Sequence, residues 1–248
     1  MYHHGGLIYS QSYLLLSQGA CGSCWAYAAT GTLEASASRR IAFQAYMEVI
    51  QNTLDTLHDS SKDTFVRNDR AVRLAQMAER QAIAVADLSV QELVDCDTWA
   101  DQGCTGGNPL LAFYFIHRFG LTSTSSYPYV GQQQECQVDR VANPIASVQS
   151  WGILTSNHED NMELVLQNIG PIAVGVNGAD QTFLAYTGGI FDSLNCDQVA
   201  NHALLIVGYG QETDSKGRTV RHINKTCCCI IRLKTLTLLV LCFVLILR

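Results

Sequence analysis

A cysteine and a histidine, far apart in the chain, have the neighbours best suited to nucleophilic chemistry. Cys24 lies within residues 18–25 (QGACGSCW), directly after a Gly-Ser pair and before an aromatic residue. A thiol is mostly protonated at neutral pH, and an imidazole within hydrogen-bond reach can hold it as the thiolate half of an ion pair. His202, within residues 200–204 (ANHAL), is the histidine whose context best suits this partnership. Such a pair would attack a carbonyl carbon and then protonate the leaving group.

Two different elements are expected to carry these side chains. The segment from Cys24 to about Ala42 has apolar residues at helical spacing and no proline, which predicts a helix that begins at the cysteine. The N-terminus of a helix carries a partial positive charge, and this charge favours a thiolate. His202 precedes an apolar strand, Ala203–Val207, which runs into residues 208–210 (GYG). The chemistry therefore requires one end of a helix to meet one end of a strand.

Both stretches resemble segments of the papain-like cysteine peptidases. Residues 21–25 (CGSCW) fit the C-G-[SA]-C-[WY] signature of that family. Residues 88–96 (LSVQELVDC), 103–107 (GCTGG) and 200–210 are similar to further family segments, so the resemblance covers about residues 18–210. It implies a cysteine-type peptidase that hydrolyses peptide bonds through a thiolate–imidazolium pair and an acyl-enzyme, with no cofactor and no metal.

The resemblance also implies roles for individual residues. Cys24 is the implied nucleophile and His202 the implied general acid and base. Gln18 is the implied oxyanion donor through its side-chain amide, beside the backbone N–H of Cys24. The residues that the resemblance places along the substrate cleft are Gly106, Gly107, Asn108, Pro109, Gly175 and Ala200. The small side chains at the last two positions imply a roomy apolar subsite.

The ten cysteines suggest an oxidising compartment. By resemblance Cys21 pairs with Cys104, and Cys96 pairs with Cys136. Each such bridge contributes roughly 2–4 kcal/mol to stability. Cys196 matches a position whose family partner lies beyond the region of resemblance, so it is expected to be unpaired.

Composition narrows the class of partner. A hydrophobic content of 48% and a charged content of 15% fit a globular core. The net charge of −6 gives no basic surface for nucleic acid, so nucleic acid is not expected as a partner. The resemblance implies polypeptide substrates, protein inhibitors, a monomer, and a lysosomal or extracellular location. Residues 1–17 are an atypical N-terminal segment in which no signal peptide is seen, because a basic start is lacking and the apolar run Leu14–Leu16 is too short.

The order of the elements predicts an α+β fold. Helical patterns dominate residues 18–144, and short strands such as Ile172–Val176 and Gly188–Phe191 dominate residues 145–210. This order agrees with the two lobes of the papain-like fold, a helical N-terminal lobe and a β-barrel-like C-terminal lobe, with the cleft between them. Residues 18–210 are thus expected to form one peptidase domain.

Residues 43–86 are expected to be a helical insertion in the first lobe. They contain many helix formers and one break near residues 59–61 (DSS), which predicts one or two amphipathic helices. Family members join these points by a shorter link. The insertion explains why residues 24 and 202 are further apart than the roughly 130–150 residues typical of the family. Two alternatives remain open, a packed or solvated decoration and a hairpin that binds a regulator or partner.

A short helix is predicted after the insertion. Ser89 precedes Glu92 by three residues, which is the spacing of a capping box. The paired glycines Gly106 and Gly107 follow this helix and permit close backbone approach. In the family this stretch pairs with the backbone of the substrate like an added strand.

The resemblance ends near residue 210, and residues 211–248 form a divergent tail. Family members continue into an Asn-Ser-Trp-Gly motif whose asparagine orients the imidazole. Here residues 221–226 (RHINKT) lead into three cysteines and an apolar run. Asn224 is the one asparagine after His202 and so the remaining candidate for that role, although its Lys-Thr neighbours do not fit the motif. Without the motif, we expect the final strands of the second lobe to be missing.

The tail leaves two further alternatives. Its apolar run Leu236–Leu247 is shorter than the roughly 17–25 residues of a membrane-spanning helix, so a membrane-tethered form is the less favoured alternative. A truncated, catalytically impaired relative that binds peptides as a decoy is the other, because the orienting asparagine is missing. His222 lies near Cys227–Cys229, but adjacent cysteines lack the usual spacing of zinc ligands and no metal site is expected.

Overall fold

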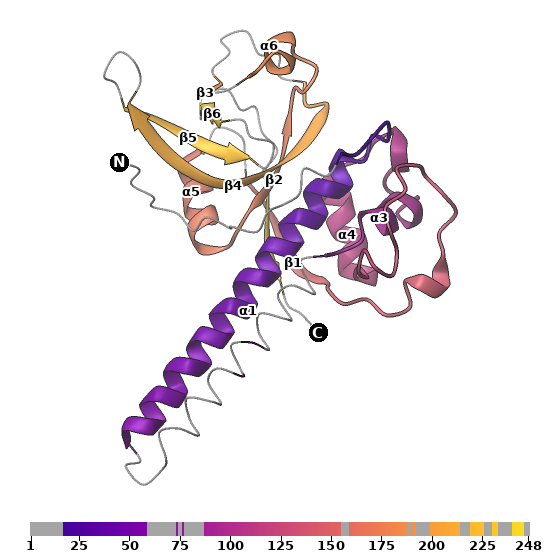
Figure 1. Ribbon diagram of the computed structural model, residues 1–248. Coiled ribbons are helices and arrows are strands. Elements are labelled where there is room, and N and C mark those ends of the chain that lie inside the picture. Colours follow the sequence, from indigo (N-terminus) through magenta and orange to yellow (C-terminus); the bar gives the residue numbers. More distant parts are fainter. Residues whose placement is uncertain are drawn as a thin grey trace.

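Two lobes lie on either side of the first part of one long helix in the computed structural model of the chain (Figure 1). The structure describes residues 17–58, 73, 76, 87–154, 159–187, 190–191, 199–213, 219–225, 230–232 and 240–245. One lobe is built from helices and the other around an antiparallel sheet, so the predicted α+β class is confirmed.

Helix α1 (Cys24–His58) begins at the predicted residue but continues well past the predicted end near Ala42. Residues 43–58 contain neither proline nor glycine, so nothing in the local sequence stops the helix there. The break predicted near residues 59–61 lies outside the described residues. The first part of the predicted insertion is therefore an extension of α1.

Helix α3 (Val90–Cys96) has the predicted serine cap, but the second bond of the predicted capping box is replaced by two bonds to Thr122. The Ser89 hydroxyl accepts the backbone N–H of Glu92 at 3.0 Å. The Glu92 carboxylate does not turn back to Ser89 but accepts the N–H of Thr122 at 2.7 Å. The N–H of Ser89 donates instead to the Thr122 carbonyl at 2.9 Å. The cap thus also ties α3 to a distant loop.

Helix α4 (Pro109–Phe119) follows the glycine pair and has suitable residues at both ends. The Asn108 side chain accepts the N–H of Leu110 at 3.0 Å, and proline occupies the first turn, where its missing N–H is not needed. Gly120 ends the helix with a φ of 78°, a left-handed conformation that favours glycine. The 3₁₀ turns Gly103–Thr105 and Val138–Arg140 flank this helix in the chain.

In the described part of the second lobe, seven strands form a sheet in the order β1-β7-β2-β4-β5-β6-β3. All neighbours are antiparallel except β3 and β6. The strands are β1 (Val148–Leu154), β2 (Ile172–Val176), β3 (Ile190–Phe191), β4 (His202–Thr213), β5 (Thr219–Lys225), β6 (Ile230–Arg232) and β7 (Val240–Leu245). The helices of this lobe are α5 (Glu159–Asn168) and α6 (Gln181–Leu184).

The divergent tail contributes strands to this sheet. We expected the final strands to be missing, yet β5, β6 and β7 all come from the tail, and β7 lies between β1 and β2. Strand β4 also continues through residues 208–210 to Thr213, with a register shift between Ile206 and Gly208. No helix within the described ranges is long and apolar enough to cross a membrane.

The sheet separates two hydrophobic clusters. The cluster between α1, α3 and α4 includes the fully buried residues Trp25, Leu33, Leu93, Phe113 and Ile116. The cluster between α5 and the sheet contains Met162, Leu166, Ile172, Val174, Val176, Leu204 and Ile206. Ala173 belongs to the first cluster and both its neighbours to the second, as the alternation of side chains along a strand requires. One face of the sheet therefore packs toward α1.

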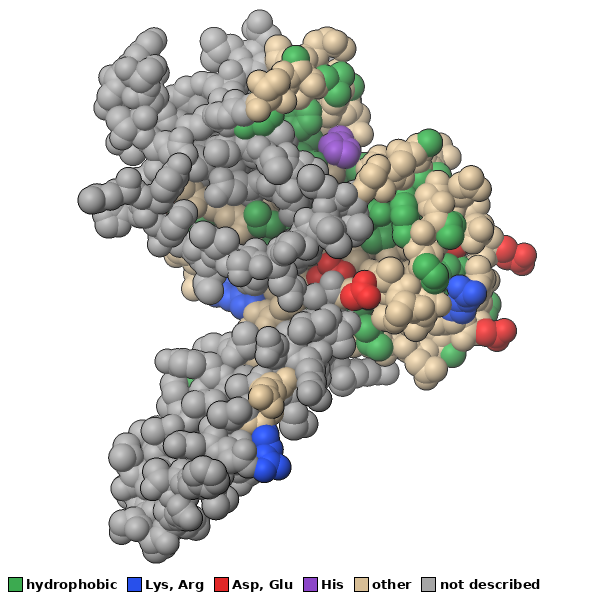
Figure 2. Space-filling view, in the orientation of Figure 1, with side chains coloured by type: hydrophobic (Ala, Val, Ile, Leu, Met, Phe, Trp, Pro, Cys, Tyr) green, Lys and Arg blue, Asp and Glu red, His purple; other side chains and the backbone are tan. Residues whose placement is uncertain are grey.

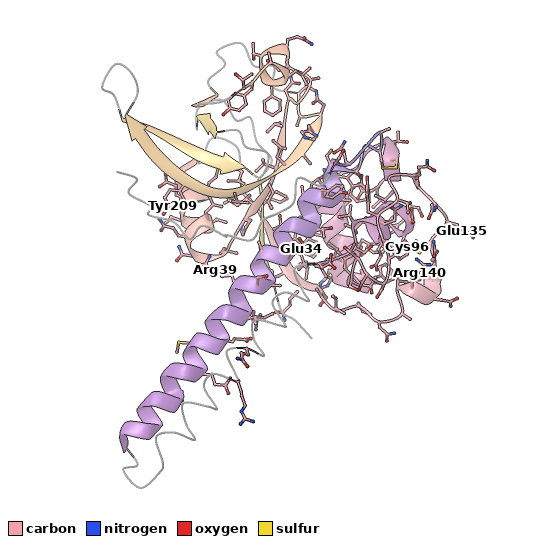
Figure 3. The ribbon with its side chains drawn as sticks, viewed as in Figure 1. Glu34, Arg39, Cys96, Glu135, Arg140 and Tyr209 are labelled. Atoms are coloured by element: carbon pink, nitrogen blue, oxygen red, sulfur yellow. A yellow bond between two sulfur atoms is a disulfide. The ribbon has the colours of Figure 1, made fainter. Side chains whose placement is uncertain are left out.

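Helix α1 holds the lobes together through polar side chains. Glu34 accepts the N–H of Leu88 at 2.8 Å in the helical lobe. One turn further along, Arg39 donates to the carbonyls of Leu166, at 3.4 Å, and Gln167 in the last turn of α5. Figure 3 labels Glu34 and Arg39 along α1. A single helix thus bonds to both halves of the molecule.

Candidate active site

Cys24 lies at the start of α1, in a turn whose backbone is tightly constrained. Its thiol is half-buried and is free of any disulfide. The N–H of Gly22 donates to the Cys104 carbonyl at 2.8 Å, and a disulfide joins Cys21 to Cys104. A Cβ on Gly22 would lie 2.6 Å from that carbonyl oxygen. Only glycine fits this approach, which presents the thiol at the end of the helix.

The loop of paired glycines packs directly against the first turn of α1. The Trp25 indole is fully buried and donates to the Gly103 carbonyl at 3.0 Å. A Cβ on Gly107 would lie 2.6 Å from the Trp25 ring and 2.6 Å from an oxygen of Asp101. The aromatic residue after the cysteine therefore fixes the loop beside it.

The four predicted substrate contacts of this loop differ in exposure. Gly106 has a φ of 136° and open space on its Cβ side, so its backbone is accessible. Gly107 and Asn108 are exposed. Pro109 is buried as the first residue of α4, so its side chain faces the core.

Two buried carboxyl groups lie beneath this loop. Asp101 accepts the N–H of Asn108 at 2.6 Å, and Asp97 is fully buried nearby. Burial, and then the neighbouring Asp101, raise the pKa of Asp97 to about 8, while burial raises the pKa of Asp101. The pair therefore retains a proton at neutral pH. No group of three His, Cys, Asp or Glu side chains that could hold a metal ion occurs in the described part of the chain.

Gln18, the predicted oxyanion donor, lies half-buried ahead of the nucleophile. Its backbone carbonyl accepts the Tyr129 hydroxyl at 2.8 Å. The same hydroxyl is 2.7 Å from the hydroxyl of Ser23, the residue before Cys24. Sequence reasoning did not single out Tyr129, because nothing local relates it to residues 18–24.

His202 is the first residue of β4 and pairs with Val176 of β2. Its side chain is half-buried and packs on Gly178. A Cβ on Gly178 would lie 2.7 Å from Cβ of His202 and 3.1 Å from Cγ. A side chain at residue 178 would therefore displace the imidazole.

Asn201 is a positioning residue that sequence reasoning missed. Its side-chain oxygen accepts the N–H of Gly178 at 2.8 Å, and its amide donates to the Asn177 side chain at 2.8 Å. Its own N–H donates to the Val176 carbonyl at 3.0 Å. The available signal was the Asn-Gly pair after β2, a turn sequence that needs a partner for its backbone.

Gly175 and Ala200, the other predicted substrate contacts, lie against each other. A Cβ on Gly175 would lie 2.9 Å from Cβ of Ala200. Ala200 is exposed and Gly175 is half-buried. The space that a larger side chain at residue 175 would take is thus filled by Ala200.

The two elements that begin with Cys24 and His202 contact each other between the lobes. A Cβ on Gly31 of α1 would lie 3.0 Å from a methyl of Leu205 on β4. Cys24 lies two turns before Gly31, about 10 Å along the helix. His202 lies three residues before Leu205, about 10 Å along the strand. The surface is hollowed between the lobes at the end where α1 begins (Figure 2).

The register of the tail places Asn224 away from the imidazole. Asn224 pairs with Gly208 on β4. Gly208 lies six residues beyond His202, about 20 Å along an extended strand. The one asparagine after His202 thus lies far along the strand from it.

Two disulfides staple the helical lobe. Besides the Cys21–Cys104 bridge at the nucleophile turn, Cys96 at the end of α3 is joined to Cys136. These are the pairs that the family resemblance implies. Cys196 and the tail cysteines 227–229 lie outside the described residues.

Comparison with known proteins gives the family of this chain. A family model for papain family cysteine proteases matches residues 71–224. Cathepsin S of Bos taurus is 31% identical over 196 residues, or 78% of this chain and 46% of its own length. Zingipain-2 of Zingiber officinale is 32% identical over 199 residues, or 80% of this chain and 70% of its own length.

A solved structure shares the fold. The Carica candamarcensis cysteine protease CMS1MS2, crystallised in complex with E-64, superposes with a TM-score of 0.58 and 21% identity over 92% of this chain and 90% of its own. The chain spans about half the length of cathepsin S and cathepsin K, to which it is similar. The family model, the sequence relatives and the shared fold agree, and the chain belongs to the papain family of cysteine proteases.

Proposed function

We propose that this chain hydrolyses peptide bonds in polypeptides through Cys24 and His202. Family membership supports peptidase chemistry in general. One observation supports the assignment to these two residues. Helix α1, which begins at Cys24, contacts strand β4, which begins at His202, where Gly31 packs on Leu205.

The reaction follows from the roles of the two groups. The Cys24 sulfur forms a bond to the scissile carbonyl carbon, and the carbonyl oxygen takes the negative charge. The Gln18 side-chain amide and the Cys24 N–H donate to this oxyanion. The imidazolium of His202 gives its proton to the amine as the C–N bond breaks. Water, deprotonated by His202, then hydrolyses the thioester.

The glycine loop is proposed to bind the substrate backbone as an added strand. The open space beside Gly106 and the exposure of Gly107 and Asn108 support this role. On the other lobe, Gly175 and Ala200 would border the same substrate. Pro109 would not touch the substrate but would fix the start of α4, which follows the glycine loop.

The setting is proposed to be an acidic, oxidising compartment, lysosomal or extracellular. Two disulfides support oxidising conditions. The buried carboxyl pair, Asp97 and Asp101, supports acidic conditions, since both pKa values are raised. In such a compartment a monomer would meet polypeptide substrates and protein inhibitors.

The test combines turnover with labelling. Purified chain is assayed on a library of fluorogenic peptides and then treated with a thiol-directed epoxide, and the labelled peptide is identified by mass spectrometry. We expect turnover, and labelling at Cys24 that blocks it. Cys24→Ala should abolish both, and Ala179→Ser, at an exposed site, should change neither. Turnover that survives Cys24→Ala would reject the proposal.

A second candidate function is peptide binding without turnover. The register of the tail favours it, because Asn224, the one asparagine after His202, pairs with Gly208 and not with a residue beside His202. Fluorescence anisotropy with labelled peptides separates the two functions. Saturable binding with no cleavage and no epoxide labelling would support the decoy, and cleavage would exclude it.

A further inference from the structure

We propose that Tyr129 is a positioning residue that sets the oxyanion donor Gln18 relative to the nucleophile turn. The inference rests on the proposed peptidase function. The Tyr129 hydroxyl lies 2.8 Å from the Gln18 carbonyl oxygen and 2.7 Å from the Ser23 hydroxyl. These two partners flank the turn that leads into Cys24. One hydroxyl therefore joins the backbone of Gln18, whose side chain is one proposed oxyanion donor, to Ser23, the residue before the other donor, the Cys24 N–H.

The direction of the two hydrogen bonds follows from the donor inventory. A backbone carbonyl can only accept, so the one hydroxyl proton of Tyr129 is donated to the Gln18 carbonyl. The Ser23 hydroxyl must then donate to the Tyr129 oxygen, since Ser23 is buried. The resulting relay runs from Ser23 through Tyr129 to Gln18. Removal of the Tyr129 hydroxyl breaks both bonds at once.

The residues on both sides of Tyr129 in the chain are hydrogen-bonded to helix α3. Two residues earlier, the fully buried Tyr127 donates to Asp95 at 2.9 Å. One residue later, the N–H of Val130 donates to the Gln91 side chain at 2.9 Å. Asp95 and Gln91 are both on α3. The hydroxyl of Tyr129 is therefore attached to a rigid support rather than to a free loop.

The Tyr129 ring also packs on helix α1. It meets Tyr27 edge-on, with ring centroids 5.2 Å apart. Burial, and then Tyr129, raise the pKa of Tyr27 above its usual value. Because a phenylalanine keeps the ring contact, Tyr129→Phe removes only the hydroxyl.

The middle of the turn has a separate anchor. Gly22 donates to the Cys104 carbonyl at 2.8 Å, and the Cys21–Cys104 disulfide lies beside it. This anchor holds the turn to the glycine loop, and it makes no bond to Gln18. Loss of the Tyr129 hydroxyl should therefore release Gln18 while the thiol keeps its place.

Two probes of the thiol separate these effects. Iodoacetamide alkylates the thiolate and needs no oxyanion donor. A peptide aldehyde accepts the thiolate at its carbonyl carbon, a C–S bond forms, and the oxygen becomes an oxyanion that the Gln18 amide can stabilise. Tyr129→Phe should weaken aldehyde binding about 10-fold, because a misplaced group costs this much or more. It should leave the rate of alkylation of Cys24 within about twofold, since ion-pair formation is untouched.

A double-mutant cycle shows whether Tyr129 acts through Gln18. If it does, Tyr129→Phe has no further effect on aldehyde affinity in a Gln18→Ala background, because residues that act as a unit are not additive. The matched control is Tyr114→Phe on α4, whose ring also packs edge-on, at 5.2 Å from Trp99. Aldehyde affinity of this control should equal that of the wild type. If Tyr129→Phe does not fold, Ser23→Ala removes the other end of the relay and should have a smaller effect of the same sign.

The outcomes separate the inference from the proposed function. Three results would overturn the role of Tyr129 alone. They are unchanged aldehyde affinity in Tyr129→Phe, additive effects with Gln18→Ala, and a loss of alkylation rate as large as the loss of aldehyde affinity. A wild-type chain that neither cleaves peptides nor binds the aldehyde would reject the peptidase proposal, and this inference with it. A non-additive loss confined to the aldehyde supports the inference.

Discussion

At the scale of single residues, the site depends on positions where a side chain is forbidden. Gly22 lets the nucleophile turn approach Cys104, and Gly107 lets the glycine loop approach Trp25. Gly178 does the same for the imidazole of His202. At each of these positions, the absence of a Cβ lets a segment of the proposed site approach the residue beside it.

Gly178→Ala should lower kcat/KM while the chain stays folded. The added Cβ would lie 2.7 Å from Cβ of His202, so the imidazole must move. Displacement of a catalytic side chain costs on the order of 10–100-fold in rate. Steady-state kinetics on a fluorogenic peptide measure the change. Ala179→Ser, which adds one atom at the exposed neighbouring residue, should have no effect, and equal kinetics for the two variants would contradict the contact.

Residues that act locally were predictable, and residues that act at a distance were not. The start of α1 at Cys24 and the Ser89 cap follow from a few adjacent residues. Glu92 was expected to complete that cap, but it binds Thr122, thirty residues away in the chain. Tyr129 and Asn201 were missed for the same reason. Their partners are set by tertiary packing rather than by spacing.

At the scale of elements, α1 is the structure on which both lobes depend. Its first turn carries the nucleophile, and its fourth and fifth turns bond to both lobes through Glu34 and Arg39. The end of this helix could not be predicted, because no residue in 43–58 opposes helix formation. The tail strands could not be predicted either, since strand pairing is a non-local contact and the tail sequence does not indicate its partners.

Arg39→Met should destabilise the chain by about 1 kcal/mol. The variant keeps the aliphatic stem and removes the donors to the Leu166 and Gln167 carbonyls. It also removes a positive charge from the C-terminal end of α5, where such a charge is favourable. Urea unfolding measures the change. The control is Arg140→Met, an exposed arginine also labelled in Figure 3, which should stay within about 0.5 kcal/mol of wild type. Equal midpoints for the two variants would show that the α1–α5 bonds contribute nothing.

At the scale of the whole molecule, buried carboxyl groups make the stability of the helical lobe depend on pH. Burial raises the pKa of Glu34 to about 8 and that of Glu92 to about 7. Burial and the neighbouring Asp101 raise the pKa of Asp97 to about 8. All of these groups bind a proton more tightly in the folded chain than in the unfolded chain.

Thermal stability should therefore fall as the pH rises. Unfolded aspartate and glutamate titrate near about 4, so between about pH 4 and pH 8 the folded chain holds protons that the unfolded chain has lost. This contribution to stability is complete below about pH 4 and is lost as pH passes the raised values. Melting temperature should be higher at about pH 5 than at about pH 7.5, by roughly 5 °C. A melting temperature that rises over this range would contradict the assignment.

Asp97→Asn should flatten that pH dependence. The amide cannot ionise, so the contribution of this residue between about pH 4 and pH 8 disappears. Differential scanning fluorimetry across the range measures the slope. Asp139→Asn, at an exposed site, should leave the slope as in the wild type. An unaltered slope in Asp97→Asn would show that the pair beneath the glycine loop does not hold a proton.

The central claim is that a thiol from the helical lobe and an imidazole from the sheet lobe form one ion pair. The most direct measurement is the rate at which iodoacetamide alkylates Cys24, followed by peptide mass mapping from about pH 4 to pH 9, in the wild type and in His202→Ala. The wild type should already be alkylated rapidly at the acidic end of this range, because the imidazole holds the thiol as a thiolate, and the variant should react rapidly only at the alkaline end. Identical rate profiles in the two proteins would contradict the pairing.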